Sequence, residues 1–425
     1  MNRIKNILVQ HKNKLVTLSD QGLVSGINFL VGILLARWIG LENYGIYALI
    51  WMVVLFVSSV HQSAFISSLF ALLPRKENPN QFINQLMGLQ VIFSCLACGS
   101  IIFLGITLGG TIESIADISE TSPANLTNLF LTAAIASVFV LNDFLRRVGF
   151  AKQQSKLVLS MDLIGYGLQP LLLFTLNTND LLDVQGTLAA LFFSYSISSL
   201  IGIIRLQCIP TFKDIAAVTL EVWSYSRFLI GTSLLQWLSG NFYLLTAAGV
   251  LGPVALGAIR IAQNVMGIMH LLLLTLENLV PLKAAETLHK KGRSATVKYV
   301  FRIFLQAAVP FVGLLVPIAF FRAELLALIY GNSYVDYAFV LLGFCGIYIL
   351  IFIGTQLRFL IRTFERNNLI FWSYVATSIL GLSTANYFVT QFQIYGVLAG
   401  IALTQIIMVG FYLFSLKSEL KWLIK

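Results

Sequence analysis

This chain of 425 residues is too apolar to fold in water, since 58% of its residues are hydrophobic, 11% are charged and its mean hydropathy is +0.85. Soluble domains carry roughly 25% charged residues. The net charge of +10 does not indicate nucleic-acid binding, because the basic residues lie in short segments between long apolar runs. The alternating pattern of an outer-membrane barrel is missing. The sequence therefore predicts an all-α polytopic membrane protein.

Apolar runs long enough to cross a membrane as helices follow one another along the chain. They are bounded by charged residues, proline, asparagine and glycine. The twelve predicted transmembrane helices cover residues 15–39, 46–73, 84–109, 126–148, 157–176, 185–205, 226–250, 253–282, 299–321, 337–357, 369–390 and 395–416.

The distribution of basic residues predicts how these helices are oriented. If the N-terminus is cytoplasmic, 25 of the 28 Lys and Arg residues fall in cytoplasmic segments, and the exceptions are Arg37, Arg260 and Arg322. Segments 111–125 and 177–183, on the opposite side, are acidic or neutral. We expect a multi-pass protein of the bacterial inner membrane with both termini in the cytoplasm and no cleavable signal peptide.

An internal repeat is visible when the chain is shifted by 212 residues. This shift aligns residues 36–40 with 248–252, Gly45 with Gly257, and Arg146 with Arg358. With six predicted helices on either side of a central linker, it predicts two parallel six-helix halves around a central cavity, an architecture of transporters. The halves are residues 1–206 and 226–425, joined by a cytoplasmic linker at 207–225.

The eighth predicted helix carries the most informative polar stripe. Arg260, Gln263 and Asn264 fall on one face among Ile, Val, Met and Leu residues. Ionisable groups within a membrane are costly and often functional. This face either contacts an anionic, sugar-bearing substrate or forms hydrogen bonds to neighbouring helices, with Arg260 paired to an acid.

The first and seventh predicted helices carry milder polar stripes. We place Gln21, Ser25 and Asn28 of the first helix, and Gln236 and Tyr243 of the seventh, on the substrate path. Each of these helices begins one half, so the two stripes are suited to line a cavity from both sides. The alternative is close helix packing through small residues.

Asp20 and His61 are candidates for binding a coupling ion. Asp20 lies near the cytoplasmic start of the first predicted helix, where it could bind H⁺ or Na⁺, cap the helix, or pair with Lys12 or Lys14. His61 lies midway along the second predicted helix, and an imidazole titrates near physiological pH. Its alternative role is that of an ordinary buried hydrogen-bonding residue.

A cluster of charges surrounds the turn between the fourth and fifth predicted helices. It comprises Asp143, Arg146, Arg147 and Asp162. The spacings i,i+3 and i,i+4 allow Asp143 to pair with either arginine. The cluster either fixes the topology as an ion network or serves as a cytoplasmic gate that contacts pyrophosphate.

Three common enzyme motifs are absent from the sequence. The sequence has no glycine-rich nucleotide loop, no HExxH and no GxSxG. The Cys95–Cys98 pair lies within an apolar helix, where packing is the simpler role. We therefore expect a transporter without catalytic residues, metal or cofactor, apart from a coupling H⁺ or Na⁺.

Three segments resemble a known transporter family. They are NFLVGILLARWIGLENYGIYAL at residues 28–49, GVLGPVALGAIRIAQNVMGIMHLLLLTLENLVPLKAAE at 249–286, and LLALIYGNSYVDYAFVLLG at 325–343. The chain resembles the polysaccharide-repeat, O-antigen type flippases of the multidrug/oligosaccharidyl-lipid/polysaccharide (MOP) exporter superfamily. The resemblance extends over essentially the whole length.

The resemblance implies a function that the composition alone does not. The protein would move an undecaprenyl-pyrophosphate-linked oligosaccharide across the inner membrane by alternating access, as a monomer among membrane lipids. A polysaccharide polymerase and a chain-length regulator would be its partners in lipopolysaccharide biosynthesis. The alternatives are a cation-coupled multidrug exporter of the same superfamily and, less favoured, a membrane glycosyltransferase or polymerase.

Overall fold

The computed structural model describes residues 2–113, 126–417 and 419, and it describes side chains at 20–107, 126–417 and 419. All regular elements in these residues are helices. In chain order they are α1 (Asn2–His61), η1 (Gln62–Ile66), α2 (Ser67–Leu72), η2 (Leu73–Arg75), α3 (Pro79–Glu113), α4 (Leu126–Ala151), α5 (Ser155–Thr178), α6 (Val184–Leu206), α7 (Ile215–Leu251), α8 (Pro253–Val265), α9 (Gly267–Phe320), α10 (Arg322–Ile329), η3 (Asn332–Tyr337), α11 (Ala338–Thr363) and α12 (Asn367–Ser415).

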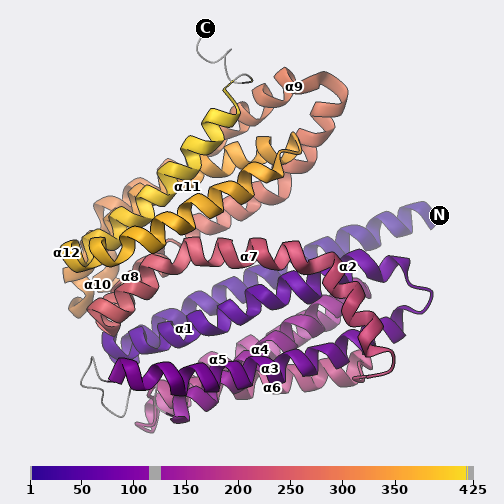
Figure 1. The fold of residues 1–425 in the computed structure, drawn as a ribbon, viewed down its shortest axis with the longest axis horizontal. Coiled ribbons are helices and arrows are strands. Elements are labelled where there is room, and N and C mark those ends of the chain that lie inside the picture. Colours follow the sequence, from indigo (N-terminus) through magenta and orange to yellow (C-terminus); the bar gives the residue numbers. More distant parts are fainter. Residues whose placement is uncertain (1, 114–125, 418, 420–425) are drawn as a thin grey trace. The chain divides into compact units, whose positions relative to one another are not determined.

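Within this described part, nine helical stretches are long and apolar enough to cross a membrane. Three of them contain one residue with a non-helical backbone, which is Gly40 in α1, Gly292 in α9 and Gln393 in α12. Figure 1 shows that each of these three ribbons doubles back on itself. The nine stretches therefore provide twelve membrane-crossing segments, as the sequence predicts.

The chain forms two compact units, here called unit 1 (Met1–Leu234) and unit 2 (Leu235–Lys425). The boundary between them lies inside α7. Residues 215–225, which were expected to be linker, are the first turns of that helix. Only residues 207–214 connect α6 to α7 without forming a helix.

The backbone repeats at the predicted offset of 212 residues. Gly40 (φ 78, ψ 171) and Gly252 (φ 83, ψ −178) share one conformation. The turn that follows α4 and the turn that follows α11 also match, since Gln153 has φ 58 and Glu365 has φ 60. Corresponding hydrogen bonds close both turns: Gln154 N donates to Gly149 O, and Arg366 N donates to Ile361 O.

In unit 1, α4, α5 and α6 pack together, and both α1 and α3 pack against α4. Their core includes Leu69, Leu86, Phe144 and Met161. The first part of α7 joins this unit through the contact between Lys76 Nζ and Glu221 Oε2 at 2.6 Å. α1 also packs against α5, and this contact positions the candidate site.

In unit 2, α11 packs against α8, α9 and α12. The core includes Val280, Val297, Phe359 and Tyr412. Three prolines lie inside α9, at positions 281, 310 and 317. Each removes one backbone donor from the helix. The two arms of α9, residues 267–291 and 293–320, are separated by Gly292 (φ 77, ψ −178).

Candidate functional site

A buried ion cluster in unit 1 brings together α1, α4 and α5. Its centre is Arg146, whose Nε lies 2.7 Å from Asp162 Oδ1. Arg146 Nη2 lies 3.4 Å from Asp20 Oδ2, and Arg146 Nη1 lies 3.8 Å from Asp143 Oδ1. Arg147 Nε donates to Asp143 Oδ1 at 3.3 Å. Asp143 thus pairs with both arginines, as its spacing predicts.

The cluster is almost completely closed to its surroundings. Asp20 is 1% exposed and Asp162 is 0% exposed. The side chain of Arg146 is 13% exposed, whereas that of Arg147 is 37% exposed. The ring of Tyr166 covers the guanidinium of Arg146 at 5.8 Å from its centroid. Charges held this deeply must be paired, because an uncompensated charge would be strongly destabilising.

The charges in the cluster do not balance. Among the described residues, three carboxyl groups face two guanidinium groups, so full ionisation of all three would leave one negative charge in excess. Asp20 Oδ1 and Asp143 Oδ2 are buried and have no hydrogen-bond partner among the described residues. A proton or a monovalent cation is the species that would neutralise this charge.

The internal repeat shows that the fold itself does not require this cluster. At the offset of 212 residues, Asp20, Asp143 and Asp162 correspond to Thr232, Thr355 and Tyr374. The arginine is kept as Arg358, and its buried Nε has no hydrogen-bond partner in the described part of the chain. An ion network that was needed only to stabilise the turn would be expected in both units. Its acids occur in unit 1 alone.

His61 lies in an aromatic pocket of unit 1. It is 0% exposed, and the rings of Phe65, Phe93 and Phe144 surround it with centroids at 5.2, 5.9 and 6.4 Å. It directly precedes η1, a single π-helical turn of the kind that often occurs at functional sites. No local pattern in the sequence predicts this turn. The role of His61 in coupling stays a prediction.

In unit 2, the eighth predicted helix is divided into two helices. α8 ends at Val265, and α9 begins at Gly267. Residues before and after Met266 therefore cannot be placed on one face by a single helical period. Arg260 Nη1 donates to Gln263 Oε1 at 2.8 Å, and Asn264 Nδ2 donates to Tyr330 OH at 2.9 Å. These three polar side chains of α8 are half-buried, while its opposite face is packed.

The other residues predicted to line the substrate path differ in exposure. Gln21 and Asn28 of α1 and Gln236 of α7 are exposed, and Ser25 is half-buried. Tyr243 is 1% exposed, and its hydroxyl hydrogen-bonds to Thr384 Oγ1 at 2.7 Å. The surroundings of Tyr243 are those of a helix-packing residue. The assignment of all five to a substrate path stays a prediction.

The structure brings together residues that the sequence analysis assigns to two different roles. Asp20 was a candidate for ion coupling, and Asp143, Arg146, Arg147 and Asp162 were candidates for a gate, yet all five form one cluster. The alternative partners of Asp20, Lys12 and Lys14, have side chains outside the described residues. In the part of the chain described, no group of three or more His, Cys, Asp or Glu residues could hold a metal ion.

No protein-family model and no curated protein matches the chain. Solved structures do match over nearly its full length. The lipid II flippase MurJ in an inward closed conformation has a TM-score of 0.66 at 13% identity, over 95% of this chain and 87% of that one. A multidrug resistance MATE family transporter in an inward-facing conformation has a TM-score of 0.63 at 15% identity, over 92% and 94%.

A third solved structure extends the comparison. A MOP superfamily transporter from Pyrococcus furiosus, described as having a binding pocket of reverse polarity, has a TM-score of 0.62 at 15% identity, over 97% of this chain and 95% of that one. At such identities the likeness concerns the fold. This chain has the fold of the MOP superfamily transporters.

Proposed function

We propose that this protein is a transporter that uses a cation gradient to move a lipid-linked oligosaccharide across the bacterial inner membrane. The substrate is an undecaprenyl-pyrophosphate-linked repeat unit for lipopolysaccharide or a related polysaccharide. The protein alternates between states open to either side of the membrane. The fold shared with a lipid II flippase and the three family-like segments support this proposal.

The observation that carries the coupling step is the ion cluster of unit 1. It is buried, it has one carboxylate in excess, and its acids have no counterpart in unit 2. Uptake of H⁺ or Na⁺ would neutralise the cluster and remove the cost of burying the extra charge. Release of the ion on the other side of the membrane would restore that cost. Such a difference in free energy is what drives a change between two conformations.

The polar face of α8 supports an anionic substrate. A guanidinium binds phosphate oxygens through paired N–H donors, and Arg260 lies beside the neutral amides of Gln263 and Asn264. Neutral amides suit the hydroxyl groups of sugars. Pyrophosphate would be held by Arg260, and the sugars by the amides of Gln263 and Asn264 on the same helix.

The experiment that tests this function measures flipping in proteoliposomes. Purified protein should transfer a labelled undecaprenyl-pyrophosphate oligosaccharide between leaflets. Arg260→Ala should abolish the transfer, and cells carrying it should lose surface polysaccharide while still inserting the protein. Arg322→Ala, which changes an arginine at the start of α10, is the matched control and should keep both activities. Normal polysaccharide with Arg260→Ala would overturn the assignment of Arg260.

The second candidate function is a cation-coupled multidrug exporter. The MATE family structures match as closely in coverage as the flippase does, and an acidic coupling site suits both functions. The two are separated by substrate. An exporter would lower the accumulation of cationic dyes in cells and would not move the lipid-linked oligosaccharide. A flippase would move the lipid-linked oligosaccharide and would leave dye accumulation unchanged.

A further inference from the structure

The two arms of α9 enclose a basic cleft that the transport cycle proposed above does not use. The cleft has a volume of about 720 Å³ and is lined only by residues of α9, on both sides of Gly292. Five exposed cations and one carboxylate, Glu286, line it. Lys290 Nζ lies 2.7 Å from Glu286 Oε1. The cations are Lys283, Lys290, Lys291, Lys298 and Arg302.

An apolar groove lies next to this cleft. Ile303 and Gln306 line both spaces, so the basic cleft and the apolar groove are direct neighbours. The groove has a volume of about 290 Å³, and the stacked rings of Phe311 and Phe352, 4.3 Å apart, form part of its wall. The other lining residues include Leu272, Leu276, Ala307 and Pro310.

The dimensions of the groove suit a hydrocarbon chain. From Ile303 to Phe311 the second arm rises about 12 Å at 1.5 Å per residue. One leaflet of the hydrocarbon core is about 15 Å thick, since the whole core is about 30 Å. The apolar end therefore extends through most of one leaflet. The basic end lies in a segment that the charge distribution places at the cytoplasmic surface.

We propose that the groove between the arms of α9 binds an anionic phospholipid of the cytoplasmic leaflet. Its phosphate lies among Lys291, Lys298 and Arg302, and one acyl chain lies along Leu276, Ala307 and Phe311. A general preference for positive charge inside explains basic loops, but it does not explain why five cations surround one cleft that adjoins an apolar groove. Charge and shape together match a phosphate head on a hydrocarbon chain. The inference does not depend on which substrate the protein transports.

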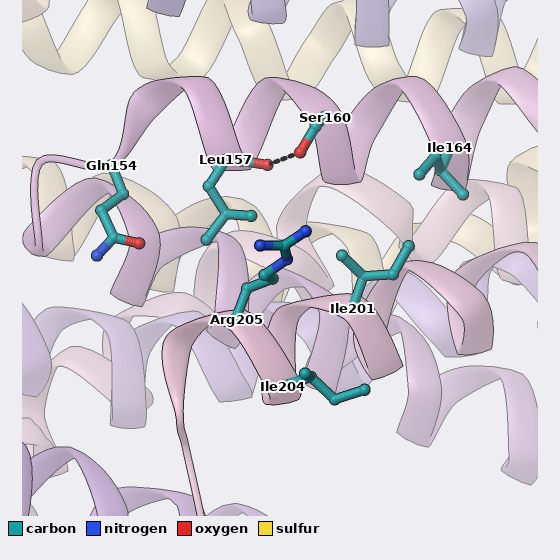
Figure 2. Close-up of a pocket in the computed structure, with 7 residues that line it drawn as sticks. All are labelled: Gln154, Leu157, Ser160, Ile164, Ile201, Ile204 and Arg205. Atoms are coloured by element: carbon teal, nitrogen blue, oxygen red, sulfur yellow. Dashed lines mark hydrogen bonds between the residues drawn. The ribbon is translucent and has the colours of Figure 1, made fainter.

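A pocket in unit 1 shows what a site of similar volume looks like without this charge. It lies between α5 and α6, has a volume of about 640 Å³, and has a single cation, Arg205, among its lining residues. Figure 2 shows the guanidinium of Arg205 beside Leu157 and Ile201. Each Lys or Arg near an anionic lipid surface contributes about 1 kcal/mol. The pocket at Arg205 is therefore expected to attract anionic lipid far less than the α9 groove does.

The test measures which lipids remain bound to the full-length protein. Detergent-purified protein is mixed with phosphatidylglycerol or with phosphatidylcholine of the same acyl chains, and bound lipid is counted by native mass spectrometry. We expect phosphatidylglycerol to be retained in preference to phosphatidylcholine. The variant with Lys291→Gln, Lys298→Gln and Arg302→Gln should lose this preference by about fivefold for each cation removed.

Three controls distinguish a lipid site from misfolding and from attraction by charge alone. Arg205→Gln should bind phosphatidylglycerol like the wild type. The charge-keeping variant with Lys291→Arg, Lys298→Arg and Arg302→Lys should also bind it, which shows that loss in the glutamine variant is not misfolding. Ala307→Trp fills the apolar end and should weaken retention while leaving all five cations in place.

Several results would overturn the proposal. One is unchanged retention of phosphatidylglycerol by the triple glutamine variant. Another is displacement of the lipid by inorganic pyrophosphate as readily as by free phosphatidylglycerol, which would indicate a site for a free anion. A third is retention of undecaprenyl phosphate but not phosphatidylglycerol, which would indicate a polyprenyl carrier as the occupant.

Discussion

At the scale of single residues, the ion cluster of unit 1 depends on Arg146 more than on Arg147. Arg146 contacts three carboxylates and is 13% exposed, whereas Arg147 contacts one and is 37% exposed. Removing one partner of a buried ion pair leaves a charge uncompensated and costs about 3–5 kcal/mol. Exposed pairs contribute about 0–1 kcal/mol. The two neighbouring arginines are therefore a matched pair for mutation.

We expect Arg146→Gln to destabilise the protein by about 3–5 kcal/mol and Arg147→Gln to destabilise it by less than about 1 kcal/mol. Thermal unfolding in detergent, followed by the loss of monodisperse protein, measures both. Equal effects of the two substitutions would show that the carboxylates do not rely on Arg146.

Asp20 is the member of the cluster that can be neutralised with least structural damage. Its contact to Arg146 is 3.4 Å, longer than the 2.7 Å contact of Asp162, and its Oδ1 has no hydrogen-bond partner among the residues described. Asp20→Asn leaves two carboxylates facing Arg146 and Arg147, so the excess charge disappears. We expect folded protein whose transport no longer responds to an imposed pH or Na⁺ gradient.

The measurement is transport into or out of proteoliposomes with and without each gradient. Glu221→Gln, which removes the partner of Lys76 outside this cluster, should keep the response. If transport by Asp20→Asn depends on the gradient as strongly as transport by the wild type does, the cluster only stabilises the structure and does not couple transport to an ion. His61→Asn in the same assay decides whether the histidine contributes.

The sequence could predict part of this cluster. The spacing of Asp143 to Arg146 and Arg147 on one helix predicts their pairing. It could not predict that Asp20 meets Arg146, because these residues are 126 positions apart. Helical periodicity gives the face of a helix, but it does not say which helix that face meets. In unit 2 the same limit applies to Tyr243, whose partner Thr384 lies on α12.

At the scale of elements, the predicted transmembrane helices agree with the observed ones, because long apolar runs leave few alternatives. The details between and within helices were less predictable. The helix break at Met266 falls inside a single predicted helix, and the π-helical turn after His61 has no local signal. Each depends on tertiary packing more than on local sequence.

The repeated corners allow a prediction about glycine. Gly40 and Gly252 adopt positive φ with extended ψ, a region that essentially only glycine occupies. Nothing lies within 4 Å of a Cβ built at either position. The cost of alanine is therefore backbone strain alone, about 1–3 kcal/mol at each corner. Thermal unfolding of Gly40→Ala and Gly252→Ala should show similar losses.

The turns at Gln153 and Glu365 are the matched control. Both residues adopt left-handed backbone conformations, with φ of 58 and 60, and glycine relieves the strain that a side chain suffers there. Gln153→Gly and Glu365→Gly should leave stability unchanged or raise it by up to about 1 kcal/mol. A large loss at either turn, or very different losses at the two glycine corners, would contradict the equivalence of the two units at these positions.

At the scale of the whole molecule, the charge distribution makes a prediction about sidedness. Residues 77 and 294 lie in segments expected in the cytoplasm, and residues 179 and 332 lie in segments expected outside. All four positions are exposed. Six predicted helices separate Glu77 from Ser294, an even number that returns the chain to the same side. The parallel arrangement of the two halves depends on this count.

Single cysteines at these positions test the sidedness. Cys208 is buried, and burial raises the pKa of its thiol, so little reactive thiolate forms there near neutral pH. Cys345 is also buried, so only Cys95 and Cys98 need replacement by serine before labelling. A membrane-impermeant maleimide should label Asn179→Cys and Asn332→Cys in intact spheroplasts. Glu77→Cys and Ser294→Cys should be labelled only after the membrane is opened.

The pattern of labelling separates two kinds of error. If all four positions exchange sides, the orientation is reversed while the number of crossings holds, and both halves remain parallel. If Glu77→Cys and Ser294→Cys lie on opposite sides, an odd number of helices separates them, and the halves are inverted with respect to each other. That second result would place the basic cleft of α9 on the opposite side of the membrane from Lys76. The labelling of Ser294→Cys by itself tests the leaflet of the cleft, because labelling at this position in intact spheroplasts would place the cleft on the outer side of the membrane.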